Sequence, residues 1–303
     1  MLKRIVIARH QGFCMGVKRA IRIAEETADQ NLGRQPVTIL KEIVHNEAVV
    51  EHFGRKGVGQ QYHVEDVDCG ALIISAHGVS PDVVKTAMAK GLTVIDATCP
   101  LVSRIYRTIN DAIDRDYYII HFGDPDHDET AGIVGHAPDR ITVVATIEEL
   151  KSLPDWPERK LGMTVQTTAH TSLFGEVARA AEEKWPGIRM FNTICNATTQ
   201  RQQAITEMAS SVDVILVVGS LSSANTNRLV KLSQDTCGDG RLIQNRDEID
   251  PRWFDNGVEA VGISAGASTP QFLIDEVIQR LVELSGGRAV VERPGGIIQD
   301  EDE

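Results

Sequence analysis

One arrangement recurs three times along the chain and limits how it can fold. It is a short apolar run, then a turn with a single cysteine, then a longer amphipathic run. The cysteines are Cys14, Cys99 and Cys195, and they are spaced almost evenly. Such alternation is typical of strands followed by helices. Pro100, directly after the second cysteine, occupies a position where helices commonly begin. The regular spacing predicts three related α/β units.

The remainder of each repeat also matches. Two further apolar runs follow each cysteine segment, and each run ends in polar residues. These ends contain His45, Asn46, His77, His127, Glu129, Gln166, Thr167, Thr168, Ser222, Ser223, Asn225, Asn227 and Ser268. Ligands of α/β sheets bind beyond the carboxyl ends of the strands. If the three units meet around one axis, the polar ends and the three cysteines converge on one ligand site.

The repeat also predicts the division of the chain. We expect α/β domains at residues 1–92, 93–187 and 188–285, followed by a C-terminal tail at 286–303. The stretch from residue 285 onward reads SGGRAVVERPGGIIQDEDE, which is rich in glycine and then acidic, and it breaks the repeat. Such a segment is typical of a tail or of a strap over a neighbouring domain.

Charge and hydropathy exclude several classes of function. The formal net charge is −12, and no basic stripe of the kind found in nucleic-acid binders is visible. No apolar run approaches the roughly 18 residues that a membrane span requires. The start, MLKRIVIARHQ, reads as a first strand rather than a signal or transit peptide. We expect a cytoplasmic protein with a small-molecule partner and with neither a nucleic-acid nor a membrane partner.

The chain has five cysteines. An odd number without a secretion signal argues against a disulfide framework. Cys69 and Cys237 do not follow a strand in the repeated way, so we interpret them as small apolar core residues. For Cys14, Cys99 and Cys195 the same interpretation would require that three core cysteines occupy equivalent places in the repeat by chance.

Two metal centres are possible for the trio. Structural zinc sites use four ligands, usually in short paired spacings, and that pairing is absent. Iron–sulfur clusters are held by thiolates, and their ligands can lie far apart in sequence. Three cysteines leave one iron of a cubane without a protein ligand. An open iron can act as a Lewis acid on a substrate oxygen. The trio therefore predicts a catalytic cluster.

The polar ends predict an anionic substrate. A single histidine at the end of a strand is more often structural or exposed to solvent, but His45, His77 and His127 occupy equivalent places in the repeats. Histidines, amides and hydroxyls are donors that suit a phosphate or diphosphate. Further neutral donors come from Ser223, Asn225 and Ser268. We interpret the other histidines as structural or solvated residues.

Glu129 is the candidate proton donor. A carboxyl group at the mouth of a sheet is usually a solvated charge or a residue of a first helical turn. Beside a cluster and a phosphate site it could act as an acid, because burial near anions raises a carboxyl pKa. Thr167 and Thr168 could cap a strand end, or a threonine hydroxyl could pass the proton on.

Nine motifs carry a family resemblance. They are, in order across residues 12–270, GFCMGVKRAI, VHNEAVV, SAHGVSP, DATCPLV, HDETAG, QTT, NTICNAT, SANTNRL and AGASTP. Together they resemble the LytB/IspH family of 4-hydroxy-3-methylbut-2-enyl diphosphate reductases. The match covers nearly the whole chain, which makes it far more specific than any single motif.

The resemblance implies a fold, a cofactor and a reaction. The fold is a clover of three pseudo-symmetric α/β domains around a 4Fe-4S cluster with one open iron. The reaction is the reductive dehydroxylation of an allylic alcohol diphosphate to isopentenyl and dimethylallyl diphosphate, the last step of the non-mevalonate (MEP) route. Two electrons come from ferredoxin or flavodoxin.

The resemblance also assigns roles to residues. It implies that Cys14, Cys99 and Cys195 ligate the cluster and that Glu129 and Thr167 deliver protons. Gln166 and Thr198 support this pair. We also expect Gln166, Thr168 and Thr198 among the residues that bind the substrate. The positions that match diphosphate contacts are His45, His77, His127, Ser223, Asn225 and Ser268.

Some positions depart from the family pattern, and alternatives stay open. Ala224 stands where a second serine is usual, and Asn192 stands where an aspartate is usual. The lost hydroxyl removes a hydrogen bond of about 0.5–1.5 kcal/mol. One alternative is a paralogue with the same open cluster that acts on another phosphorylated alcohol. Others are a redox-sensing iron–sulfur protein without turnover and a zinc-binding scaffold.

Overall fold

The structure is a computed structural model that describes residues 2–255 and 257–293. Contacts divide the chain into two units. Unit 1 comprises Met1–Cys14, His45–Glu47 and Asn196–Glu303, as far as its residues are described. Unit 2 comprises Met15–Val44 and Ala48–Cys195. Among the described residues, no helix is both long enough and apolar enough to span a bilayer.

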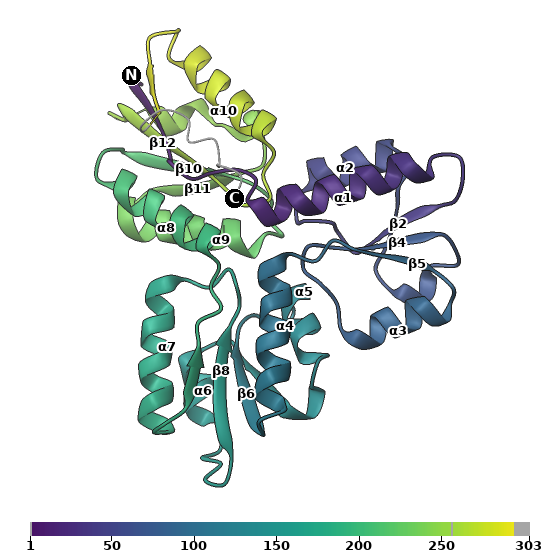
Figure 1. Ribbon diagram of the computed structural model, residues 1–303. Helices are drawn as coiled ribbons and strands as arrows, with labels where there is room; N and C mark the ends of the chain where they lie inside the picture. The colour runs from purple at the N-terminus through teal and green to yellow at the C-terminus, as the bar shows by residue number, and fades with distance from the viewer. Residues whose placement is uncertain (1, 256, 294–303) are drawn as a thin grey trace. The chain divides into compact units, whose positions relative to one another are not determined.

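Unit 1 contains one parallel sheet in the order β11-β10-β12-β1-β13. Figure 1 shows α10 on one face of this sheet and α8 with α9 on the other. The strands are β1 (Arg4–Ile7), β10 (Val214–Val218), β11 (Gly240–Ile243), β12 (Ala260–Ala265) and β13 (Val290–Glu292). The helices are α8 (Asn196–Ala209), α9 (Ala224–Cys237), α10 (Gln271–Leu284), η3 (Arg246–Glu248) and η4 (Pro251–Phe254).

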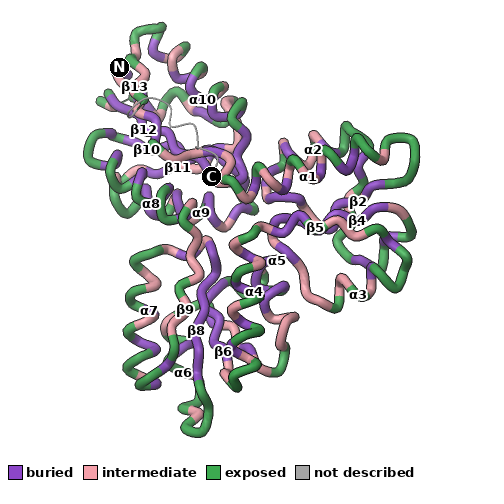
Figure 2. The backbone as a smooth tube through the Cα atoms, viewed as in Figure 1, coloured by how far each residue is buried: buried purple, intermediate pink, exposed green. Residues whose placement is uncertain are grey.

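The central strands of unit 1 are apolar because helices cover both faces of the sheet. Strand β10 reads VILVV and strand β12 reads AVGISA, and every residue of both strands is buried. Figure 2 shows this as continuous burial along the two strands. Ile205 and Met208 of α8 pack with Leu229 of α9 against Ile215 and Val217 of β10. This layer forms a core of unit 1.

Unit 2 contains two parallel sheets, in the orders β3-β2-β4-β5 and β7-β6-β8-β9. The strands of the first are β2 (Val37–Leu40), β3 (Gly59–Gln61), β4 (Ala71–Ile74) and β5 (Thr93–Asp96). Those of the second are β6 (Tyr117–Phe122), β7 (Ile141–Val144), β8 (Lys160–Val165) and β9 (Arg189–Phe191). Both sheets are packed on apolar cores, one of which includes Ile105, Ile119 and Ile133.

Helices connect successive strands of unit 2, since neighbouring parallel strands cannot be joined by a short hairpin. In chain order they are α1 (Met15–Asn31), α2 (Glu47–Arg55), η1 (Val64–Asp66), α3 (Pro81–Ala89), α4 (Pro100–Ile113), α5 (Asp128–Val134), η2 (Pro138–Arg140), α6 (Ile147–Ser152) and α7 (Thr171–Lys184). Helix α4 begins at Pro100, as its position after Cys99 predicts. The α/β fold class expected from the sequence is confirmed.

The three sheets repeat one strand order, and this order places the cysteines. If the four strands of one repeat are numbered one to four, their order across each sheet is two, one, three, four. In unit 1, β13 is added next to the fourth strand. The fourth strands are β5, β9 and β1, and each of them is followed by a cysteine of the trio. Each cysteine thus comes after the last strand of its own sheet.

Strand β1 joins a sheet whose other strands come from the end of the chain. It lies between β12 and β13, although it falls within the range 1–92. Burial of Ile5 and Ile7 in this sheet gives a physical reason for the pairing. Of the tail range 286–303, Val290–Glu292 forms β13, and 294–303 lies outside the described residues.

Candidate active site

The trio of cysteines occupies equivalent backbone positions. Each is the residue directly before a helix: α1 after Cys14, α4 after Cys99 and α8 after Cys195. A backbone hydrogen bond holds each of their amides. Cys14 N donates to Ala267 O at 3.1 Å within unit 1. In unit 2, Cys99 N donates to Ala76 O and Cys195 N to Thr167 O, both at 3.0 Å.

This donor set suits an iron–sulfur cluster. All three side chains are partly exposed, and none of the chain's five cysteines is in a disulfide. The positive end of a helix dipole favours negatively charged ligands, and each cysteine of the trio precedes such an end. The other two cysteines differ. Cys69 is exposed, and burial raises the pKa of Cys237, whose thiol donates to Val212 O.

Glu129 and Thr167 form a buried pair in unit 2. The backbone N–H of Thr167 donates to one carboxylate oxygen of Glu129 at 2.7 Å, and the Thr167 hydroxyl donates to the other at 2.6 Å. Glu129 is 2% exposed and Thr167 is 5% exposed. The carboxyl group is therefore held in one orientation, with a hydroxyl in contact through which a proton can pass.

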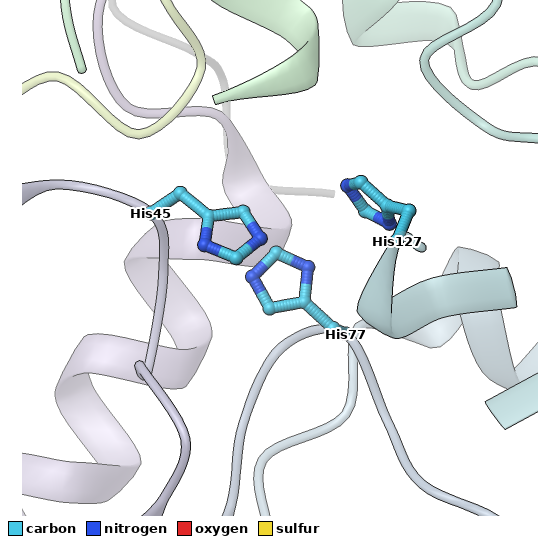
Figure 3. Close-up of side chains that lie close together, drawn as sticks. All are labelled: His45, His77 and His127. Atoms are coloured by element: carbon cyan, nitrogen blue, oxygen red, sulfur yellow. The ribbon is translucent and has the colours of Figure 1, made fainter. Parts of the chain in front are cut away.

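His127 lies two residues before Glu129, and its ring meets the ring of His77 edge to face. Their centroids are 5.7 Å apart, at an interplanar angle of 79°. Figure 3 shows His77 on the loop after β4 and His127 at the start of α5. Nδ1 of His127 accepts from the backbone N–H of Glu129 at 3.1 Å. In a neutral ring this acceptor role puts the proton on Nε2, which can then donate to an anion.

Gln166 and Thr168 flank Thr167 at the carboxyl end of β8. The side-chain oxygen of Gln166 accepts from Asp124 N at 3.0 Å, so it tethers the loop that leads to His127. Gln166 is fully buried, whereas Thr168 is partly exposed. The structure therefore brings the polar ends of β6 and β8 together in unit 2.

Unit 1 holds the other predicted polar residues. The Ser268 hydroxyl donates to the backbone oxygen of His45 at 2.9 Å. Ser223 is the N-cap of α9 and accepts from Thr226 N at 3.3 Å. Thr198 lies in the first turn of α8 and is 2% exposed. Ala224 is the first residue of α9, directly before Asn225.

The side-chain amide of Asn225 is the most informative group of unit 1. Asn225 is 6% exposed, and its Nδ2 has no hydrogen-bond partner within the described part of the chain. A buried donor without a partner costs about 1–3 kcal/mol, and a bound acceptor would remove this cost. Nδ2 of Asn225 therefore suits a ligand oxygen.

Two contacts of unit 2 were not expected from the sequence. Lys41 forms an ion pair with Asp128, which lies between His127 and Glu129. Lys41 has a φ of 62°, a left-handed conformation that is unfavourable for a lysine. Tyr106, in the middle of α4, contacts the His77 loop. Neither residue belongs to a motif, although DATCPLV ends four residues before Tyr106.

His121, a buried residue of β6, is expected to make the stability of the folded protein depend on pH. It is fully buried in β6, its Nδ1 bonds the Thr164 hydroxyl at 3.0 Å, and burial lowers its pKa to about 3. Below its ordinary pKa of about 6.5 the unfolded chain binds a proton that the folded chain does not. The folded state therefore loses stability as the pH falls through this window, by up to about 1.4 kcal/mol per pH unit.

Urea unfolding at several pH values between 7.5 and 5 tests this expectation. We expect the free energy of unfolding to fall with pH more steeply for the unaltered protein than for His121→Asn. The difference between the two proteins removes the contribution of other titrating groups. Equal slopes would show that His121 does not titrate differently in the folded and unfolded states.

A family model and named relatives match most of the chain. A family model described as LytB protein matches residues 5–282. The chain is 38% identical over 282 residues to a Pelobacter propionicus protein named 4-hydroxy-3-methylbut-2-enyl diphosphate reductase, covering 93% of this chain and 99% of that protein.

Solved structures are similar over most of their length. The E-1-hydroxy-2-methyl-but-2-enyl-4-diphosphate reductase from Plasmodium falciparum matches with a TM-score of 0.91 and 30% identity, covering 97% of this chain and 92% of that chain. An (E)-4-hydroxy-3-methyl-but-2-enyl diphosphate reductase, described as the terminal enzyme of the non-mevalonate pathway, matches with a TM-score of 0.68 and 35% identity over 93% of this chain and all of that one. By sequence and by fold, the chain belongs to the LytB family.

Proposed function

We propose that this protein is an oxidoreductase that converts 4-hydroxy-3-methylbut-2-enyl diphosphate to isopentenyl and dimethylallyl diphosphate, the last step of the non-mevalonate pathway. Its relatives are named for this substrate, and the family match spans most of the chain. The reaction consumes two electrons and two protons, breaks the carbon–oxygen bond of the hydroxyl group and releases water. The site must therefore supply electrons, protons and a grip on the diphosphate.

Cys14, Cys99 and Cys195 are the proposed ligands of a 4Fe-4S cluster. Their common position before helices supports this role. When bound, a cluster with three cysteine ligands supplies single electrons and one iron without a protein ligand that can act as a Lewis acid. The chain contributes the three thiolates and the positive ends of three helices.

The diphosphate would be held by neutral donors rather than by lysines or arginines. The proposed contacts are His45, His77, His127, Ser223, Asn225 and Ser268. The unpartnered Nδ2 of Asn225 supports the set, because a phosphate oxygen would complete its hydrogen bonding. The Nε2–H expected for His127 supports it too. Anchoring the diphosphate orients the opposite, hydroxyl-bearing end of the substrate.

The observation that carries the proposal is the buried Glu129–Thr167 pair. Loss of a hydroxyl group as water requires an acid, and Glu129 is a carboxyl group fixed in a buried position. Its contact with the Thr167 hydroxyl makes a short relay from carboxyl group to substrate. We assign the protonation of the leaving oxygen to this relay, with support from Gln166, Thr168 and Thr198. The second proton goes to carbon, at either end of the allyl fragment.

The electrons have to be supplied one at a time by a reductant. We propose ferredoxin or flavodoxin, which carry single electrons at low potential, and the cytoplasm as the compartment where they meet this protein. We also propose the three domain ranges given by the repeat, since each range contains the first three strands of one sheet. The fourth strand of each sheet lies in another range: β5 and β9 join the sheet of the range before their own, and β1 joins the sheet of the third range.

An anaerobic assay tests the proposed function. The protein is reconstituted with iron and sulfide and supplied with reduced viologen and 4-hydroxy-3-methylbut-2-enyl diphosphate. We expect rapid oxidation of the viologen and formation of both five-carbon diphosphates. A cluster-loaded protein that oxidises no viologen would overturn the proposal and favour a paralogue or a redox sensor. Ala224→Ser would then be the first variant to examine.

A further inference from the structure

We propose that Tyr106 is a positioning residue that holds the His77 loop against helix α5, which carries Glu129. This inference rests on the proposed function, because it concerns how that site is kept in order. Tyr106 belongs to α4, the helix that begins directly after Cys99. It is therefore placed between three elements that each contribute a residue to the site in unit 2.

The phenol of Tyr106 makes two directional contacts. Its hydroxyl donates to the backbone oxygen of His77 at 3.2 Å. Its ring lies against the ring of His136, with centroids 4.2 Å apart at 30°. His136 comes two residues after the end of α5. The side chain thus contacts two segments of unit 2. One is the loop after β4, and the other is the segment directly after α5, the helix that follows β6 in the second sheet.

Two glycines make room for the hydroxyl. A Cβ atom built on Gly78 would lie 2.3 Å from Oη of Tyr106, and one built on Gly132 would also lie 2.3 Å from it. Gly78 follows His77, and Gly132 lies one helical turn after Glu129. Glycine is unfavourable inside a helix relative to alanine, so Gly132 has a packing reason to be there. The hydroxyl occupies the space that both glycines leave.

The hydroxyl is a permanent donor. Burial raises the pKa of Tyr106 above its ordinary value of 10, and the nearby charge of Glu129 raises it further. The phenol therefore keeps its proton throughout the range in which an enzyme works. The bond to the His77 carbonyl oxygen is thus independent of pH.

The first test is Tyr106→Phe in the cluster-loaded protein, which keeps the ring and removes the donor. Loss of one hydrogen bond is expected to loosen the His77 loop, so KM for the substrate should rise about fivefold while kcat changes less than twofold. The inhibition constant of inorganic diphosphate should rise by the same factor. Iron content should be unchanged. A core tyrosine without a positioning role would leave KM and diphosphate inhibition unaltered.

The second test combines a substitution at Gly132 with Tyr106→Phe. In Gly132→Ala the new methyl group clashes with Oη and displaces α5, so kcat should fall at least tenfold. The double variant with Tyr106→Phe removes Oη, and the nearest ring carbon, Cζ, lies 3.3 Å from the Cβ position. We therefore expect the double variant to be more active than Gly132→Ala alone. Additive losses would overturn the proposed contact.

Gly78→Ala is the matched control. Gly78 has a φ of +74°, so alanine is strained there whatever fills the space. Adding Tyr106→Phe to Gly78→Ala should therefore restore much less activity than adding it to Gly132→Ala. If the unaltered protein does not turn over the substrate, the proposed function and this inference both fail. If it does and Tyr106→Phe is indistinguishable from it, only the role of Tyr106 fails.

Discussion

Glu129→Gln is expected to keep its cluster and to lose turnover by a factor of about 100 or more. General acid catalysis by a placed side chain contributes roughly 10²–10⁴ in rate, and glutamine has no proton to give. The amide can still accept from Thr167 N and can donate to the Thr167 hydroxyl, so the buried pair keeps its packing. The loss should therefore appear in kcat, with little change in KM.

The measurement is viologen oxidation under single-turnover and steady-state conditions, with iron and sulfide determined on the same sample. Asp126→Asn is the matched control, because it removes a carboxylate from the same loop at an exposed position. It should behave like the unaltered protein. Rates near the unaltered value in Glu129→Gln would remove Glu129 from the mechanism and leave Thr167 without a proton source.

Cys195→Ser is expected to abolish a stable cubane cluster and all turnover with it. A serine hydroxyl is similar in size but is a poor ligand for iron compared with a thiolate. Because Cys195 directly precedes α8 and its amide is bonded to Thr167 O, its backbone position does not depend on the sulfur. The variant should therefore fold and should lack the brown colour and the bound iron.

Two other cysteines provide the controls. Cys69 is exposed and comes shortly before strand β4. Cys237 is the last residue of α9, and its thiol donates to Val212 O within unit 1. Neither cysteine therefore shares the position before a helix. Cys69→Ser and Cys237→Ser should retain the iron and sulfide content of the unaltered protein. Loss of iron from either one would show that the wrong trio had been chosen.

Much of the fold could be predicted from the sequence because its signals are local. The α/β class follows from apolar runs that alternate with amphipathic ones, and the start of α4 follows from Pro100, whose ring fits a first helical turn. The recurrence of a cysteine before a helix depends only on order along the chain. The nine motifs identify the LytB family for the same reason, since they require no knowledge of contacts.

The sheet to which the first strand belongs could not be predicted in this way. Strand β1 reads RIVI and would fit several parallel sheets equally well. Its position between β12 and β13 is settled by pairing over more than 250 residues of chain. The energy of such pairing comes from the burial of both faces, which no short window of sequence contains.

The contacts inside the site likewise join residues that are far apart in the sequence. The sequence by itself determined that Glu129, Thr167 and the histidines lie in the segments that follow apolar runs, because this depends only on order along the chain. Only the tertiary structure decided that Thr167 bonds Glu129 across 38 residues, that Lys41 pairs with Asp128 and that Tyr106 fills the space left by Gly78 and Gly132. Periodicity and capping depend on near neighbours in the chain, whereas these contacts depend on how separate strands and helices pack.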